Sequence, residues 1–231
     1  MKDFKIRCSA IGKIMPNSRT KGQLSKTCQG YLEEYAIENM YGYSKDVWSK
    51  AIDKGIAVED DSIKLAEEVL NMGAMSKNEE FYENEYLTGT PDVLNDDFVL
   101  DVKSSYDATT FPWFKKDIPN KDYYYQLQGY MELTGRRKAY LVYCLVDTPS
   151  DIVEDEVRRV HYKLKEIDDN PIVRNAVEMQ HNFERVPKGQ RIKCYEIDYD
   201  AETIEKIYNR VKECREYYET LIHEQFKIEA I

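Results

Sequence analysis

Long apolar runs are missing from this sequence of 231 residues, and none approaches the length that a helix needs to cross a lipid bilayer. The first residues, Met1 to Lys5, also lack the apolar stretch of a secretory signal peptide. We therefore expect a cytoplasmic protein with no membrane contact. Segments rich in proline, glycine and serine that are long enough to separate domains are absent too. This predicts a single domain over residues 1–231.

Cysteine pairs with the close spacing of a metal site are missing as well. The five cysteines, at positions 8, 28, 144, 194 and 214, stand far apart, and none forms a CxxC pair. Zinc sites and iron–sulfur clusters usually depend on such pairs, so the spacing argues against both. We expect free thiols in a reducing compartment.

Positively charged residues are fewer than negatively charged ones. The chain has 33 Lys and Arg residues and 43 Asp and Glu residues, which gives a net charge of −10. A protein that coats nucleic acid needs cations to bind phosphates, so the charge argues mildly against that class. It does not exclude an enzyme that acts on nucleic acid. Carboxylates that bind metal ions add negative charge, and a basic lining can lie on an acidic body.

The spacing of apolar residues predicts alternating helices and strands. Helices are expected over residues 10–15, 27–41, 45–71 with a break near Gly55, 124–134, 154–167 and 201–225. Strands are expected over residues 83–94 with a bend, 98–103, 138–146 and 191–199. This order predicts an α/β domain in which helices flank a small mixed β-sheet. Its parts are a helical segment (1–80), a catalytic core (81–146), and C-terminal helices with an edge strand (147–231).

Two acidic residues and a lysine are predicted to meet in a β-hairpin. Asp92 ends one strand, a turn follows at residues 95–97, and Asp101 and Lys103 lie on the next strand. Because strand side chains alternate between faces, Asp101 and Lys103 point the same way. A carboxylate inside the apolar segment 98–102 is costly to bury without a partner, which favours a functional role. An isolated Asp-x-Lys tripeptide is otherwise normally a solvated pair.

These three residues have the chemistry of phosphodiester hydrolysis. Mg²⁺ prefers oxygen ligands, and two carboxylates can hold one or two such ions against a phosphate. The metal lowers the pKa of a bound water and neutralises charge in the transition state. A lysine can position that water or stabilise the developing charge, and the backbone carbonyl of Val102 offers another oxygen. Mn²⁺ accepts the same ligands, so the sequence does not separate the two metals.

Two further elements can complete this set. Glu59 lies on a predicted helix upstream, although a solvated acid beside Asp60 and Asp61 is the simpler interpretation of that residue alone. Gln126 and Tyr130 are four residues apart on another predicted helix and share one face. An amide and a phenol on one face can hold a phosphate, but tyrosines at this spacing usually pack.

Taken in this order, the elements resemble the RecB-like branch of the PD-(D/E)xK nucleases, and within it the phage lambda exonuclease family, also called YqaJ-type viral recombinases. The resemblance rests on segments at residues 8–15, 55–59, 89–92, 100–103 and 125–130, which read CSAIGKIM, GIAVE, GTPD, LDVK and YQLQGY. It implies a restriction-endonuclease-like core. Residues 148–190 match nothing in the family, and we interpret them as a helical insertion.

The resemblance also implies catalytic roles for single residues. Glu59, Asp92 and Asp101 would bind one or two Mg²⁺ or Mn²⁺ ions together with the Val102 carbonyl, and Lys103 would activate or orient the attacking water. One departure from the family is that Asp101, rather than the commoner glutamate, precedes the motif lysine by two positions. The metal would then lie slightly closer to the backbone.

Substrate contacts are implied at other positions. Gln126 and Tyr130 would fill the family's Q-x-x-x-Y position close to the site. Ser9 matches the serine that caps a short helix and helps to bind a 5′-phosphate, a role that suits helix N-termini, and Thr90 matches a hydroxyl residue of the same pocket. The basic residue that usually accompanies this serine is not clearly placed. Its candidates are Lys2, Arg7 and Lys13.

Members of this family form trimeric rings that enclose DNA and digest one strand from a 5′ end. The resemblance therefore implies a Mg-dependent 5′→3′ exonuclease on double-stranded DNA ends. It would supply single strands to an annealing protein during phage-type recombination, in the cytoplasm of a bacterial host. In a ring only the channel needs positive charge. Candidate channel residues are Lys13, Arg19, Lys21, Lys26, Lys115 and Lys116, each of which is otherwise a solvated surface residue.

Alternatives stay open at this point. A RecB-like endonuclease or a CRISPR-adaptation nuclease would have the same fold, although the latter often carries four clustered cysteines. A non-catalytic DNA mimic or a structural protein would fit the net charge of −10, but Asp92, Asp101 and Lys103 argue against both. The sequence itself does not show trimerisation.

Overall fold

The computed structural model of the chain describes residues 4–45, 49–166 and 168–226. Its larger sheet has four strands in the order β4-β5-β6-β7. These strands are β4 (Val93–Leu94), β5 (Val99–Ser104), β6 (Lys138–Cys144) and β7 (Ile192–Asp198). β5 and β6 run parallel, whereas β4 and β7 are antiparallel to their neighbours. The predicted mixed sheet is therefore present, with β7 as the predicted edge strand.

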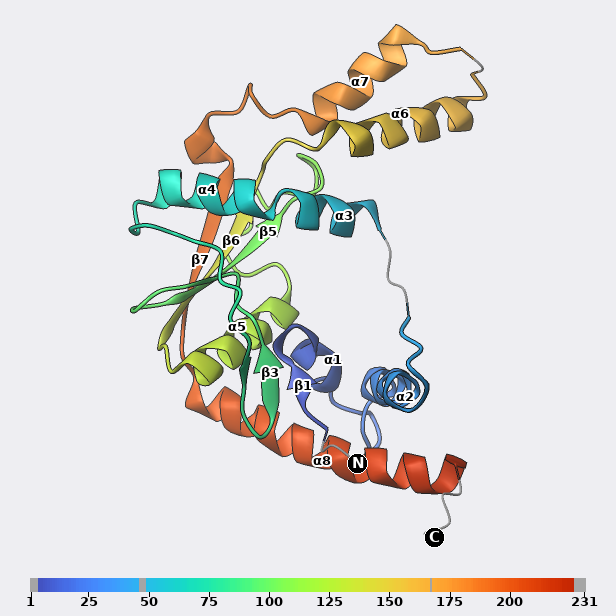
Figure 1. The fold of residues 1–231 in the computed structure, drawn as a ribbon, viewed down its shortest axis with the longest axis vertical. Helices are drawn as coiled ribbons and strands as arrows, with labels where there is room; N and C mark the ends of the chain where they lie inside the picture. Colours follow the sequence, from blue (N-terminus) through green and yellow to red (C-terminus); the bar gives the residue numbers. More distant parts are fainter. Residues whose placement is uncertain (1–3, 46–48, 167, 227–231) are drawn as a thin grey trace.

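Helices cover both faces of this sheet (Figure 1). One face carries α3 (Lys50–Ala57) and α4 (Glu59–Leu70), and the other carries α5 (Lys121–Thr134). Side chains along β5 alternate between these layers. Leu100 and Val102 pack in the cluster on the α4 side, whereas Val99 packs in the cluster that includes α5. The odd-numbered residues of β5 therefore face α5, which is the side on which the site lies.

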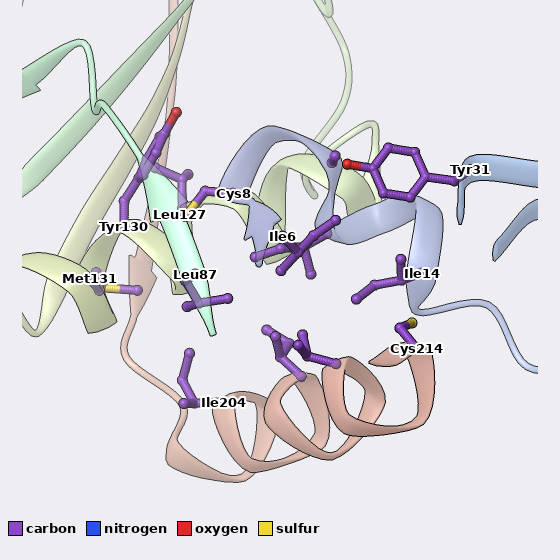
Figure 2. Packing of buried hydrophobic residues seen from close by; sticks show 14 of the residues in the cluster. Ile6, Cys8, Ile14, Tyr31, Leu87, Leu127, Tyr130, Met131, Ile204 and Cys214 are labelled. Atoms are coloured by element: carbon purple, nitrogen blue, oxygen red, sulfur yellow. The ribbon is translucent and has the colours of Figure 1, made fainter. Parts of the chain in front are cut away.

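A second, three-stranded sheet lies beside α5 in the order β1-β3-β2. Its strands are β1 (Ile6–Arg7), β2 (Tyr82–Glu83) and β3 (Leu87–Gly89). Around it lie a 3-10 turn, η1 (Cys8–Ala10), and the helices α1 (Ile11–Ile14), α2 (Lys26–Tyr41) and α8 (Ala201–Phe226). Figure 2 shows Ile6, Ile14 and Leu87 directed into a shared core with Leu127 of α5 and Ile204 of α8. This core joins the second sheet to the helix that supports the site.

Residues 148–190, which we interpreted as a helical insertion, contain α6 (Ser150–Leu164), α7 (Pro171–His181) and a 3-10 turn, η2 (Lys188–Gln190). The two helices pack on each other and extend away from the main sheet (Figure 1). We predicted only one helix here, over 154–167, the last residue of which lies outside the described residues, and missed α7. Its start is marked by Asn170, whose side chain accepts from the Ile172 N–H, followed by a proline in the first turn.

The helix predicted over residues 45–71 is two helices, and its break lies at Val58 rather than at Gly55. Residues 46–48 of that prediction lie outside the described residues. Gly55 is inside α3, whereas Val58 has φ −116° and ψ 18°, and its side chain is buried. We infer that burial of this branched side chain fixes the break, which places Glu59 at the first position of α4.

The strand predicted over residues 83–94 is wrong as one element, because it comprises β2, β3 and β4 in two different sheets. Pro91 lies between β3 and β4 and has no N–H to donate to a ladder. The chain therefore leaves the small sheet after Gly89 and enters the large sheet at Val93. The first 80 residues, predicted as helical, also contain β1.

Other expectations agree with the structure. All five cysteines lie within the described residues and are free thiols. In the described part of the chain, no helix combines the length and the apolar character needed to span a bilayer. The helix predicted over 201–225 corresponds to α8. The assignment of all 231 residues to one domain stays a prediction.

Candidate active site

The β4–β5 hairpin brings the two predicted acidic residues together. Val93 pairs with Leu100, so Asp92, just before β4, stands opposite Asp101. Asp92 Oδ2 accepts a hydrogen bond from the Val102 N–H at 2.8 Å. The turn is closed by Asn95, whose side-chain oxygen accepts two backbone N–H groups of the turn. Turn chemistry and strand register therefore place both carboxylates at one end of the hairpin.

Asp101 is held from two sides. Its side chain is only 1% exposed, and Oδ1 accepts a hydrogen bond from Gln126 Nε2 at 2.9 Å. Oδ2 lies 2.5 Å from Lys103 Nζ, which follows two residues later on the same face of β5. The same Gln126 Nε2 also donates to the Tyr130 hydroxyl at 3.0 Å. A buried amide and a buried phenol thus stand behind the carboxylate.

Gln126 and Tyr130 were predicted to contact substrate, which requires exposed side chains, but the structure places both side chains in the interior. Their side chains are 6% and 5% exposed, and both lie on the inner side of Asp101. Gly89 allows this packing, because a Cβ there would lie 2.7 Å from the Tyr130 ring. The pair orients Asp101 in this arrangement, and direct contact with substrate stays a prediction.

The electrostatics of the hairpin favour a cation. Burial and, next, the negative charge of Asp101 raise the pKa of Asp92 to about 8. Burial acts to lower the pKa of Lys103, but the charges of Asp101 and Asp92 outweigh it, so the pKa stays above its usual value. Within the described residues Asp101 Oδ2 forms an ion pair with Lys103 and accepts from no other donor. A buried carboxylate oxygen with spare bonding capacity suits a metal ion.

Glu59 lines the same cleft but is paired elsewhere. Its Oε1 lies 3.1 Å from Lys77 Nζ, and no three Asp, Glu, His or Cys side chains within the described residues stand close enough to form a metal site together. Asp92 and Asp101 have the oxygen donors that a metal ion prefers, but Glu59 is held by Lys77, and metal binding at these residues stays a prediction. We did not predict a role for Lys77, which lies in an isolated bridge with Val93, and its sequence context gives no signal for one.

The cleft has a volume of about 510 Å³ and contains Glu59, Asp92 and Lys103. Its remaining wall is largely apolar and aromatic. These wall residues are Ile52, Ile56, Tyr106, Tyr123 and Tyr143. Lys103 Nζ lies 4.9 Å from the centre of the Tyr123 ring, so an aromatic face and a carboxylate hold the ammonium from different directions. Tyr123 precedes Gln126 by three helical positions, and that spacing was a usable signal that we missed.

A buried lysine is bonded to the backbone of two residues that line this cleft, Ser105 and Tyr106. Lys54 on α3 is fully buried, and its Nζ donates to the carbonyls of Ser105 and Tyr106 at 2.8 and 3.0 Å. The ammonium also lies 5.1 Å from the centre of the Phe183 ring. Burial lowers the pKa of Lys54 to about 8. Lys54 thereby fixes α3 to the segment that follows β5.

The residues predicted to bind a 5′-phosphate do not form one enclosed pocket. Ser9 lies within η1 and is exposed, its side chain caps neither η1 nor α1, and Thr90 is exposed as well. Arg7 lines a separate hollow of about 580 Å³ with Thr88 and lies 3.9 Å from a carboxylate of Glu38. The predicted helix cap is therefore wrong, because η1 and α1 begin at other residues. Phosphate binding itself stays a prediction.

The predicted basic contacts lie on the surface. Lys2, one candidate partner of Ser9, lies outside the described residues, and Lys13 lies over the Tyr31 ring at 5.2 Å. The candidate channel residues are all exposed: Lys13, Arg19, Lys21, Lys26, Lys115 and Lys116. Their contact with DNA stays a prediction.

Comparisons with known proteins give matches among solved structures. No protein-family model and no curated protein matches the chain. A phage-related exonuclease from Haemophilus somnus 129PT is 29% identical, with a TM-score of 0.80 and 96% of each chain covered. The alkaline exonuclease LHK-Exo from Laribacter hongkongensis shares the fold at 16% identity and a TM-score of 0.64, covering 99% of this chain and 96% of that one. Its complex with dAMP matches at 18% identity and a TM-score of 0.63, covering 97% and 95%.

These matches are similarities of the whole chain rather than of a motif, since each spans at least 95% of both partners. They confirm the resemblance to phage-type exonucleases that the five short segments indicated. All three confirm the restriction-endonuclease-like α/β fold, and the similarity to the phage-related exonuclease confirms the predicted class of enzyme, a nuclease.

Proposed function

We propose that this chain is a metal-dependent exonuclease that hydrolyses DNA at the β4–β5 hairpin. The observation that carries the proposal is that Asp92, Asp101 and Lys103 lie together at one end of the hairpin, beside a cleft that Asp92 and Lys103 line. Similarity over 96% of the chain to a phage-related exonuclease supports it. A DNA mimic has no need for a buried and a half-buried carboxylate beside a lysine.

The metal ligands we propose are Asp92, Asp101 and the Val102 carbonyl, joined by Glu59 once it has left Lys77. A bound Mg²⁺ or Mn²⁺ ion, or two of them, supplies an activated water and neutralises charge at the phosphate. Asp92 contributes its free oxygen, because its other oxygen is bonded to the Val102 N–H. Lys77 then becomes available to a phosphate beside the cleft.

Lys103 has the position for the remaining catalytic role. Its ammonium is charged at neutral pH because the neighbouring carboxylates keep the pKa of Lys103 high despite burial. It stands at the border between the buried Asp101 and the open cleft, with a side chain that is 24% exposed. From there it can orient a water or stabilise an oxygen of the phosphate during attack.

Gln126 and Tyr130 orient the proposed metal ligand Asp101 from its buried side. The amide fixes one oxygen of Asp101, so that the other is directed toward Lys103. The phenol in turn fixes the amide. Such partners behind a metal ligand commonly change metal affinity when they are removed.

The finer features of the proposal rest on the family resemblance. They are action on double-stranded DNA ends, 5′→3′ polarity, a trimeric ring and delivery of single strands to an annealing protein. Arg7, Ser9 and Thr90 stay candidates for the end-binding contacts, although they are spread over an open surface. A ring is consistent with the net charge of −10, because only the channel needs cations.

An endonuclease of the same fold is the main competing function. The deciding experiment compares a linear blunt duplex with the same DNA as a covalently closed circle, in Mg²⁺ and then with a chelator. We expect release of mononucleotides from the linear DNA alone, only with metal, and faster with a 5′-phosphate. Cleavage of the circle would instead indicate an endonuclease.

A further inference from the structure

The loop formed by residues 113–116 (the 113–116 loop) presents the aromatic side chain of Phe114 to solvent. Phe114 is 95% exposed, yet the loop around it is well held. Trp113 Nε1 donates to the Ala108 carbonyl at 2.6 Å, and the Tyr195 hydroxyl donates to the Lys115 carbonyl at 3.1 Å. A phenylalanine in this position contributes little to the core, and the anchored backbone keeps it outside.

A row of side chains leads from the catalytic lysine toward this loop. Lys103 pairs with Tyr143 on β6, which pairs with Lys193 on β7. Residues paired in this way lie on one face of a sheet. Lys193 Nζ lies 5.9 Å from the centre of the ring of Tyr195, the residue that anchors the 113–116 loop.

The charges along this surface are available to a ligand. Within the described residues Lys115, Lys116 and Lys193 form no ion pair, although acidic residues exceed basic ones in the chain. Lys115 and Lys116 are exposed and flank Phe114 directly. Unpaired cations next to an exposed aromatic ring are the combination that binds single-stranded nucleic acid, because phosphates contact the cations and bases stack on the ring.

We infer that the 113–116 loop and Lys193 bind a single-stranded segment of the DNA substrate, with a base stacked on Phe114. This inference rests on the proposed function, since it extends the cleft at Lys103 across the sheet to the edge strand. A single strand fits better than a duplex, because the faces of paired bases are already stacked. The other candidate occupant of an exposed phenylalanine is a second copy of this chain, which the experiment below separates.

The test is the binding of a fluorescein-labelled oligothymidylate, followed by fluorescence anisotropy in a chelator that prevents hydrolysis. Phe114→Ala should weaken binding about tenfold. The matched control is Phe81→Ala, which removes another exposed phenylalanine, 61% exposed, from a different part of the surface and should leave affinity unchanged. Both variants should keep the melting temperature of the wild type.

The lysines provide a second readout. Lys116→Ala should lower the slope of log affinity against log salt by about 0.7, as expected for one lost phosphate contact to a single strand. Equal affinities of Phe114→Ala and wild type for the single strand would overturn the inference. The inference would also be overturned if Phe114→Ala weakened binding to blunt duplex alone. The same holds if Phe114→Ala changed the sedimentation of the protein, because Phe114 would then be a contact between copies of the chain.

DNA binding and DNA hydrolysis are measured in separate experiments. The affinity for oligothymidylate is measured without metal, so it can support the inference even if the chain hydrolyses nothing. Hydrolysis of a minimal chromogenic phosphodiester should be the same in Phe114→Ala and wild type, because that substrate does not reach the loop. A wild type that binds the strand but has no metal-dependent hydrolysis would contradict the proposed function alone.

Discussion

Lys103 Nζ lies 4.9 Å from the centre of the Tyr123 ring. The ring is held in turn by the first turns of α5 and by an edge contact with Tyr143, whose ring centre is 6.3 Å away. The ammonium is therefore fixed between an aromatic face and the Asp101 carboxylate. Its position does not depend on the carboxylate alone.

This relationship predicts the effect of changing Tyr123. Tyr123→Phe keeps the aromatic face and should keep kcat within about twofold, because the cation contacts the ring rather than the hydroxyl. Tyr123→Leu should lower kcat about tenfold with little change in KM. Steady-state digestion of linear duplex DNA measures both constants, and equal kcat values for the leucine and phenylalanine variants would contradict a positioning role.

Gln126→Leu removes the hydrogen bond to Asp101 Oδ1 without adding volume. We expect the affinity for Mn²⁺ to fall about 10- to 100-fold, as is typical when the partner of a metal ligand is lost. Isothermal titration with Mn²⁺ alone, in the absence of DNA, measures this. Tyr130→Phe is the control for the outer member of the pair and should have a smaller effect. An unchanged Mn²⁺ affinity in Gln126→Leu would show that the amide does not orient the ligand.

Gly129→Ala should destabilise the fold. An added Cβ would lie 2.7 Å from Cys8 Sγ and 2.8 Å from Ile11 Cδ1, both buried beneath α5. Overpacking of this kind costs about 1–3 kcal/mol. Gly30→Ala is the matched control, because this glycine also lies inside a helix but a Cβ added to it would have nothing within 4 Å. That control should be neutral or stabilising by up to about 1 kcal/mol, and urea unfolding compares the two variants.

The lowered pKa of Lys54 predicts that the stability of the fold rises with pH in the alkaline range. Burial lowers its pKa from 10.5 to about 8 in the folded chain, so between these pH values the unfolded chain binds more protons than the folded one. Stability therefore rises with pH across that window. Relative to Lys54→Met, the wild type should gain up to about 3 kcal/mol between pH 8 and pH 10.5. A difference in unfolding free energy that stays constant over this range would contradict the buried, easily deprotonated state of Lys54.

The hairpin was predictable from local signals. The turn at Asn95 and the apolar strand 98–103 fixed the register that sets Asp92 opposite Asp101. The support behind Asp101 was only partly predictable. Helical spacing placed Gln126 and Tyr130 on one face, but it could not say whether that face points to substrate or into the core.

Other features depend on packing that spans long sequence distances. Lys77 meets Glu59 only because α4 and the segment before β2 converge. The break at Val58 follows from burial of its side chain, whereas Gly55 has the stronger intrinsic tendency to break a helix. Pro91 was a signal in the sequence that β3 and β4 are separate strands. That the two strands belong to different sheets could be seen only in the folded structure.

The central claim is that Asp92, Asp101 and Lys103 carry out metal-dependent hydrolysis of DNA. Its most direct test is the initial rate of nucleotide release from a linear, 5′-phosphorylated duplex in Mg²⁺, with Lys103→Ala compared to wild type and to Lys163→Ala, an exposed lysine on α6. The account predicts a loss of about 10²–10³-fold in Lys103→Ala alone. Undiminished metal-dependent cleavage by that variant would contradict it.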